Sequence, residues 1–83
     1  MKIAMTGATA GIGLVAARAL LAKGAKLTYG ARRPEDPPAD LRGRATALSL
    51  DLASLASVRA FAEQLKAAGP WDALLLNAGA QTV

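Results

Sequence analysis

Cysteine and histidine are both absent from this chain of 83 residues. Without cysteine there is no disulfide or thiolate metal site, and without histidine the commonest general base and metal ligand is missing. Only three large aromatic residues occur, Tyr29, Phe61 and Trp71, so the core must be aliphatic and rich in alanine. No apolar run approaches the length of a membrane span. We therefore expect a soluble protein without a membrane-spanning segment.

Strong clustering of charge is also lacking, although the formal net charge is +4 and the pI is near 10.1. Only Arg32, Arg33, Arg42 and Arg44 lie close together in the sequence. Because there is no long basic run and no aromatic residue between the arginines, we do not expect a nucleic-acid partner. Met1 leads straight into an apolar run without a signal peptide, which favours a cytoplasmic protein.

The composition that is present is that of one small globular domain. The chain is 53% hydrophobic and 19% charged, which excludes a disordered composition. Its length is close to the minimum at which a single hydrophobic core suffices. There is no room for a second domain.

A glycine-rich stretch, TGATAGIG at residues 6–13, follows a short apolar run and precedes an Ala/Leu-rich segment. This order predicts a strand, a phosphate-binding loop and the start of a helix. Glycines in such a loop allow a tight turn and close approach of a ligand, and the free amides of the following helix attract an anion. The glycines that serve this role are Gly7, Gly11 and Gly13.

The rest of the chain alternates between predicted strands and helices. Strands are expected at residues 2–6, 25–30, 44–50 and 73–76, the first and last of them buried, and helices at 11–23 and from Ser54 to Gly69. Three prolines in residues 34–38 leave room for at most one helical turn before the third strand. Helical spacing predicts two buried faces, composed of Ile12, Val15, Ala16, Ala19 and Leu20 in the first helix and of Leu55, Val58, Phe61, Ala62 and Leu65 in the second.

The end of the second predicted strand carries Arg32 and Arg33, about 20 residues beyond the glycine loop, where an acidic residue would favour NAD. Guanidinium groups instead match the oxygens of a ribose 2′-phosphate. The sequence therefore predicts NADP (NADPH) as the cofactor. The alternative is that both arginines are ordinary solvated loop charges.

Two further stretches lie at the carboxyl ends of predicted strands, where ligands bind in open parallel sheets. Asp51 and Leu52 are predicted to lie near the adenine, although an aspartate also suits the loop before a helix. Asn77, Ala78 and Gly79 end the last strand and are expected to line the cofactor. An ordinary strand-ending turn would use the same residue types.

Taken together, these motifs resemble the short-chain dehydrogenase/reductase family in order and spacing over essentially all 83 residues. The stretch DLASLASVRAFAEQL is similar to the retinol dehydrogenase and protochlorophyllide reductase branch. The resemblance implies an α/β, Rossmann-type parallel sheet with strand order 3-2-1-4 and helices on both faces. It also implies hydride transfer between NADP(H) and a small-molecule carbonyl or alcohol. In the glycine loop, the cofactor-binding residues that the resemblance implies are Gly7, Thr9, Ala10, Gly11, Ile12 and Gly13. Ala10 and Leu76 depart from the family's pattern, since a second basic residue and a first asparagine are common there.

The family's Ser, Tyr and Lys catalytic set has no counterpart in these residues. Tyr29 is the only tyrosine, and Arg33, not lysine, follows it by four positions. We therefore expect the chain to be the N-terminal, cofactor-binding part of a longer domain, with no catalytic residue of its own. The edge of the fourth strand would then be open, and the chain is expected to be marginally stable or to form homo-oligomers through that edge. The alternative is a non-catalytic nucleotide-binding or self-associating module.

Overall fold

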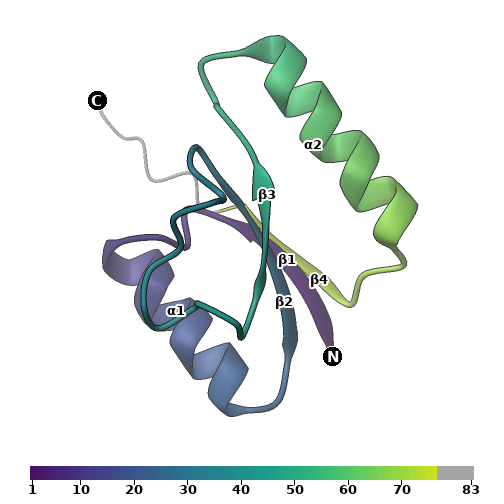
Figure 1. Cartoon of the computed structure of the whole chain (residues 1–83). Coiled ribbons are helices and arrows are strands. Elements are labelled where there is room, and N and C mark those ends of the chain that lie inside the picture. The colour runs from purple at the N-terminus through teal and green to yellow at the C-terminus, as the bar shows by residue number, and fades with distance from the viewer. Residues whose placement is uncertain (77–83) are drawn as a thin grey trace.

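The computed structural model describes residues 1–76, which form a parallel four-stranded sheet between two helices (Figure 1). The strands are β1 (Lys2–Thr6), β2 (Lys26–Ala31), β3 (Thr46–Ser49) and β4 (Ala73–Leu76), and the helices are α1 (Gly11–Ala22) and α2 (Leu55–Ala68). The sheet order is β3-β2-β1-β4. This confirms the predicted fold class and strand order. β3 is shorter than predicted. The prediction that β4 is buried was wrong: Leu74, Leu75 and Leu76 are exposed, because β4 lies at the edge of the described sheet.

All four strands point the same way, so their carboxyl ends share one edge of the sheet. β1 is central, and its Met5 lies level with Tyr29 of β2 and Leu75 of β4. The chain leaves this edge to enter α1 on one side of the sheet and α2 on the other (Figure 1). Both loops that precede a helix therefore lie at the same edge.

The main core lies between α1 and the sheet, and the prediction of its helical face was partly wrong. Ile12 is 85% exposed and Val15 is 62% exposed, and Ala19 is exposed too. The buried positions of α1 are instead Gly13 and Ala17. Because nearly every residue of this helix is apolar, periodicity could not select the buried side, and the smallest residues pack closest to the sheet.

The opposite face of the sheet packs against α2 through Phe61, which is buried as predicted. Leu50, at the end of β3, is buried beside it. In the predicted apolar face of α2, Val58 and Leu65 are half-buried, whereas Leu55 and Ala62 are exposed. α2 therefore packs on the sheet through Phe61, Val58 and Leu65, a narrower apolar face than the sequence predicted.

The amino edge of the sheet is tied to the end of α2 by Lys2 and Trp71. The Lys2 ammonium donates a hydrogen bond to the carbonyl of Ala68 and lies 4.8 Å from the centroid of the Trp71 ring. Trp71 Nε1 donates to the carbonyl of Leu65 at 2.7 Å, and the Lys2 backbone N–H donates to Asp72 Oδ2 at 2.6 Å. These contacts fix the carboxyl end of α2 relative to β1.

The Tyr29 side chain is fully buried in the core, and its hydroxyl has no hydrogen-bond partner among residues 1–76. Burial raises the pKa of the Tyr29 phenol above its ordinary value. In the unfolded chain the phenol ionises near pH 10, whereas in the folded chain it stays neutral to higher pH. The contribution of Tyr29 to stability is therefore complete below about pH 10 and decreases above it.

We predict that Tyr29→Phe removes this part of the pH dependence. The unfolding free energy of wild type should decrease more steeply above about pH 10 than that of the variant, because all other groups are common to the two proteins and their contributions cancel. At neutral pH the variant should be at least as stable, since it removes a buried hydroxyl that has no partner within residues 1–76. Urea unfolding at pH 7 to 11 measures both effects. Parallel pH profiles would contradict the prediction.

Candidate functional site

A cleft of about 570 Å³ opens at the carboxyl edge of the sheet, between the ends of β1, β2 and β3. Its floor and walls come from three segments that are distant in the sequence. The lining residues are Thr6, Gly7, Thr9, Gly30, Ala31, Arg32, Arg33, Asp36, Leu50, Asp51, Leu52 and Ala53. The fold therefore brings the glycine loop, the arginine pair and the Asp51–Leu52 segment to one place.

The loop between β1 and α1 depends on two glycines with positive φ angles. Gly7 has φ 70° and Gly11 has φ 58°, a region that other residues enter only with strain. A Cβ added at Gly11 would have no described atom within 4 Å. The space beside the helix start is therefore open, and the backbone there is accessible to a ligand.

The amino end of α1 is left without a side-chain cap, in contrast to α2. Ala10 occupies the N-cap position of α1 and makes no side-chain hydrogen bond, and no acidic residue lies in the first turn. In α2, the Ser57 N–H donates to Ser54 Oγ at 3.2 Å. Because the first amides of a helix carry partial positive charge, the open end of α1 suits an anion.

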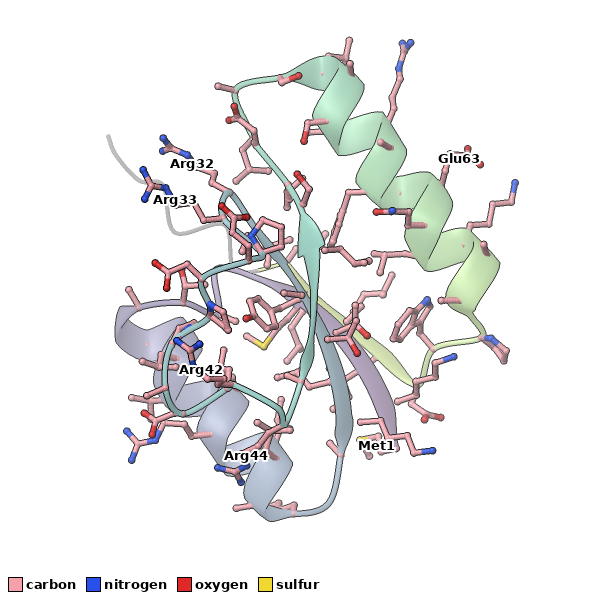
Figure 2. All side chains as sticks on the ribbon, in the orientation of Figure 1. Met1, Arg32, Arg33, Arg42, Arg44 and Glu63 are labelled. Carbon is pink, nitrogen blue, oxygen red and sulfur yellow. The ribbon has the colours of Figure 1, made fainter. Side chains whose placement is uncertain are left out.

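Arg32 and Arg33 are exposed and extend from the loop after β2 into solvent at the rim of the cleft (Figure 2). Neither guanidinium group has a carboxylate within 4 Å among residues 1–76. The ion pair found in these residues is between Arg18 and Asp40, at 3.5 Å. Arg42 and Arg44 lie away from this pair, toward the other end of the sheet (Figure 2). The two cleft arginines are therefore available to an added anion.

The loop between β3 and α2 is held in a compact turn around Asp51. Asp51 Oδ1 accepts a hydrogen bond from the Ala53 N–H at 3.0 Å, and the Asp51 carbonyl accepts one from the Ser54 N–H at 3.0 Å. The Asp51 N–H donates to Ser57 Oγ at 2.8 Å. The exposed Leu52 follows directly, so this turn forms one wall of the cleft.

The residues predicted from the sequence fall into three groups. Six of them line the cleft, namely Gly7, Thr9, Arg32, Arg33, Asp51 and Leu52. Four lie at the start of α1 beside the cleft, with Ala10, Gly11 and Ile12 exposed and Gly13 buried against the sheet. Asn77, Ala78 and Gly79 lie outside the described residues.

Sequence reasoning missed several residues of the cleft. Asp36 places a carboxylate in the same cleft as the two arginines, and the turn that carries it closes with a hydrogen bond from its N–H to the Arg33 carbonyl at 3.1 Å. Gly30 belongs to the strand but lines the cleft as well. The proline-rich composition of residues 34–38 indicated only a loop, and only the fold shows that the loop turns back over the sheet edge.

Residues 1–76 contain no cluster of three or more metal-ligating side chains and no helix long and apolar enough to cross a membrane. Tyr29, the single tyrosine, is fully buried. It therefore cannot contact a substrate. The described site is suited to bind an elongated anion along the carboxyl edge of the sheet, where backbone amides, guanidinium groups and carboxylates lie close together.

Comparison with known families and proteins identifies similar sequences over the whole chain. The family profile described as short chain dehydrogenase matches residues 1–83. A "Probable oxidoreductase" of Streptomyces antibioticus is 41% identical over 86 residues, which cover 94% of this chain and 28% of that protein. "Short-chain dehydrogenase chyC" of Penicillium rubens is 41% identical, with 94% and 31% covered. "Retinol dehydrogenase 14" of Mus musculus is 36% identical, with 93% and 29% covered.

Solved structures show the same similarity. A "short chain dehydrogenase/reductase family protein" superposes with a TM-score of 0.76 at 37% identity, covering 96% of this chain and 34% of that one. A short-chain dehydrogenase from Streptomyces avermitilis gives a TM-score of 0.69 at 31% identity, with 88% and 28% covered. The chain thus spans about one third or less of the length of these proteins.

Proposed function

The chain belongs to the short-chain dehydrogenase family, and from this we propose that it is the NADP-binding N-terminal part of a Rossmann domain. We further propose that the whole protein transfers hydride between NADP(H) and a carbonyl or alcohol substrate. The observation that carries the proposal is the cleft itself, which joins an uncapped helix end to two arginines that have no ion-pair partner within residues 1–76.

Each part of the cleft suits one part of a dinucleotide. The open amides at the start of α1, reached past Gly7 and Gly11, would bind the pyrophosphate. Arg32 would bind the 2′-phosphate with Arg33 beside it, because guanidinium groups offer paired donors to phosphate oxygens. Asp51 and Leu52 would contact the adenine.

In this proposal the cofactor carries the hydride, and the described residues bind the cofactor. NADP(H), when bound, supplies or accepts the hydride. The residues of this chain bind and orient the cofactor, and Thr6 and Thr9 line the cleft beside its proposed phosphate region. Asn77, Ala78 and Gly79 are also proposed to line the cofactor. Proton transfer to the substrate would require a Ser together with a YxxxK pair, and these 83 residues contain no YxxxK sequence.

Fluorescence titration with NADPH tests the proposal on the chain as it is. We expect saturable binding of NADPH, and we expect 2′,5′-ADP to displace it. This small ligand carries the 2′-phosphate and the 5′-phosphate of the adenosine half of NADPH, which the cleft is proposed to bind. A folded chain that binds neither ligand would contradict the proposal. For the whole protein, a mass or coding sequence that extends past residue 83 and includes Ser and YxxxK, together with NADPH-dependent carbonyl reduction, would support hydride transfer.

A second candidate function is self-association through β4. Leu74 and Leu76 of this strand are 57% and 79% exposed, an unusual amount of apolar surface for a small domain. β4 pairs with β1 on one side, and its other edge has no strand beside it in the described sheet. Sedimentation velocity at several concentrations tests this function, since a homo-oligomer would show a mass above 8.4 kDa. A folded monomer at every concentration would exclude it.

A further inference from the structure

Ser57 lies in the first turn of α2 and is half-buried. Its Oγ accepts the hydrogen bond from the Asp51 N–H at 2.8 Å, while its own N–H donates to Ser54 Oγ. Ser57 thus joins the helix to the wall of the cleft by a side-chain contact, although it does not line the cleft itself. Neither its residue type nor its spacing indicated this contact.

The contact completes the set of bonds that orient Asp51. The Asp51 N–H, carbonyl and Oδ1 are each paired, with Ser57, Ser54 and Ala53 respectively. Asp51 Oδ2 and the N–H of Leu52 have no partner within residues 1–76. The turn therefore leaves one acceptor and one donor unused on adjacent residues that line the cleft.

Resting on the function proposed above, we propose that Ser57 is a positioning residue for recognition of the adenine base. An adenine edge carries an amine that donates and a ring nitrogen that accepts, which matches the unused pair on Asp51 and Leu52. Ser57 fixes the backbone from which both groups project. Its loss would let the turn rotate, so the carboxylate would no longer be held toward the base.

The test compares NADPH with its hypoxanthine analogue, in which a carbonyl oxygen replaces the adenine amine. In Ser57→Ala, NADPH binding should weaken roughly five- to tenfold, the effect of one well-placed hydrogen bond. Binding of the hypoxanthine analogue should change less than about twofold, because its edge carries an acceptor in place of the amine and an N–H in place of the accepting ring nitrogen, the reverse of the pattern that matches Asp51 and Leu52. Ser57→Thr keeps a hydroxyl and should restore most of the NADPH affinity.

Ser54→Ala is the matched control. This variant removes the N-cap of α2 and destabilises that helix, as the loss of a capping side chain does. It leaves the hydrogen bond from the Asp51 N–H to Ser57 Oγ in place. The ratio of NADPH affinity to analogue affinity should stay at the wild-type value. A general effect of helix destabilisation would lower the binding of both ligands in both variants.

The outcomes separate the two proposals. If Ser57→Ala weakens both ligands equally, or neither, while wild type binds NADPH, the positioning role is wrong and the proposed function stands. If folded wild type binds neither ligand, the proposed function fails, and the role of Ser57 fails with it. Faster hydrogen exchange of the Asp51 amide in Ser57→Ala than in Ser54→Ala is also expected, and equal rates would contradict the role of Ser57.

Discussion

Replacing Gly30 with alanine is expected to lower the unfolding free energy by about 2 kcal/mol or more, because the new methyl group has no space. A Cβ at this position would lie 2.6 Å from Leu50 Cδ2, 2.8 Å from Leu50 Cβ and 3.0 Å from Phe61 Cε1. The Leu50 Cβ cannot move without its backbone, so β3 or α2 must shift. In a domain of this size, such a loss is a large part of the total stability.

Gly24→Ala provides the contrast for this prediction. Gly24 has φ 87°, but a Cβ added there would have no described atom within 4 Å, so alanine causes backbone strain without a clash. Urea unfolding of both variants should show the larger loss of unfolding free energy for Gly30→Ala. If α2 moves to accommodate the methyl group, the fluorescence of Trp71 in the folded variant should change as well. Equal stability of Gly30→Ala and wild type would contradict the close packing of β2, β3 and α2.

Replacing Arg32 with alanine is expected to weaken NADPH binding roughly ten- to hundredfold and NADH binding by less than about threefold. A hydrogen bond to a charged group contributes about 1.5–3 kcal/mol, and each 1.4 kcal/mol changes affinity tenfold. The 2′-phosphate is the group that distinguishes the two ligands. Titration of both dinucleotides into wild type and variant measures this difference.

Arg44→Ala is the control for the loss of one positive charge. Arg44 is an exposed arginine that lies away from the cleft, and its Nη1 donates only a long hydrogen bond of 3.5 Å to the Asp40 carbonyl. It should leave the ratio of NADPH to NADH affinity unchanged. Equal losses of NADPH and NADH binding in Arg32→Ala would refute the 2′-phosphate role and would leave the arginine as a solvated charge.

The order of strands and helices could be predicted because each boundary has a local cause. Gly7 ends β1 at a positive φ angle, Ser54 caps α2, and the short apolar run at residues 73–76 forms a strand, although its leucines are exposed and not buried as predicted. The buried face of α1 could not be predicted, since its sequence is apolar on almost every side. Which side is buried depends on the close approach of Gly13 and Ala17 to the sheet, a property of the packed structure.

The candidate site shows the same division. The glycine loop and the arginine pair have recognisable sequence patterns, and the fold places both at one cleft. Asp36, Gly30 and Ser57 have no such pattern. Asp36 reaches the cleft through a loop that turns back, Gly30 lines it from the end of β2, and Ser57 is connected to it by a hydrogen bond across a turn. Contacts of this kind become visible only in three dimensions.

The central claim is that the cleft binds a dinucleotide and prefers the one that carries a 2′-phosphate. The most direct measurement is the ratio of the dissociation constants of NADH and NADPH for the wild-type chain in the same buffer. We predict that NADPH binds at least about tenfold more tightly, as expected for one charge-assisted contact to the added phosphate. Equal affinities, or tighter binding of NADH, would contradict it.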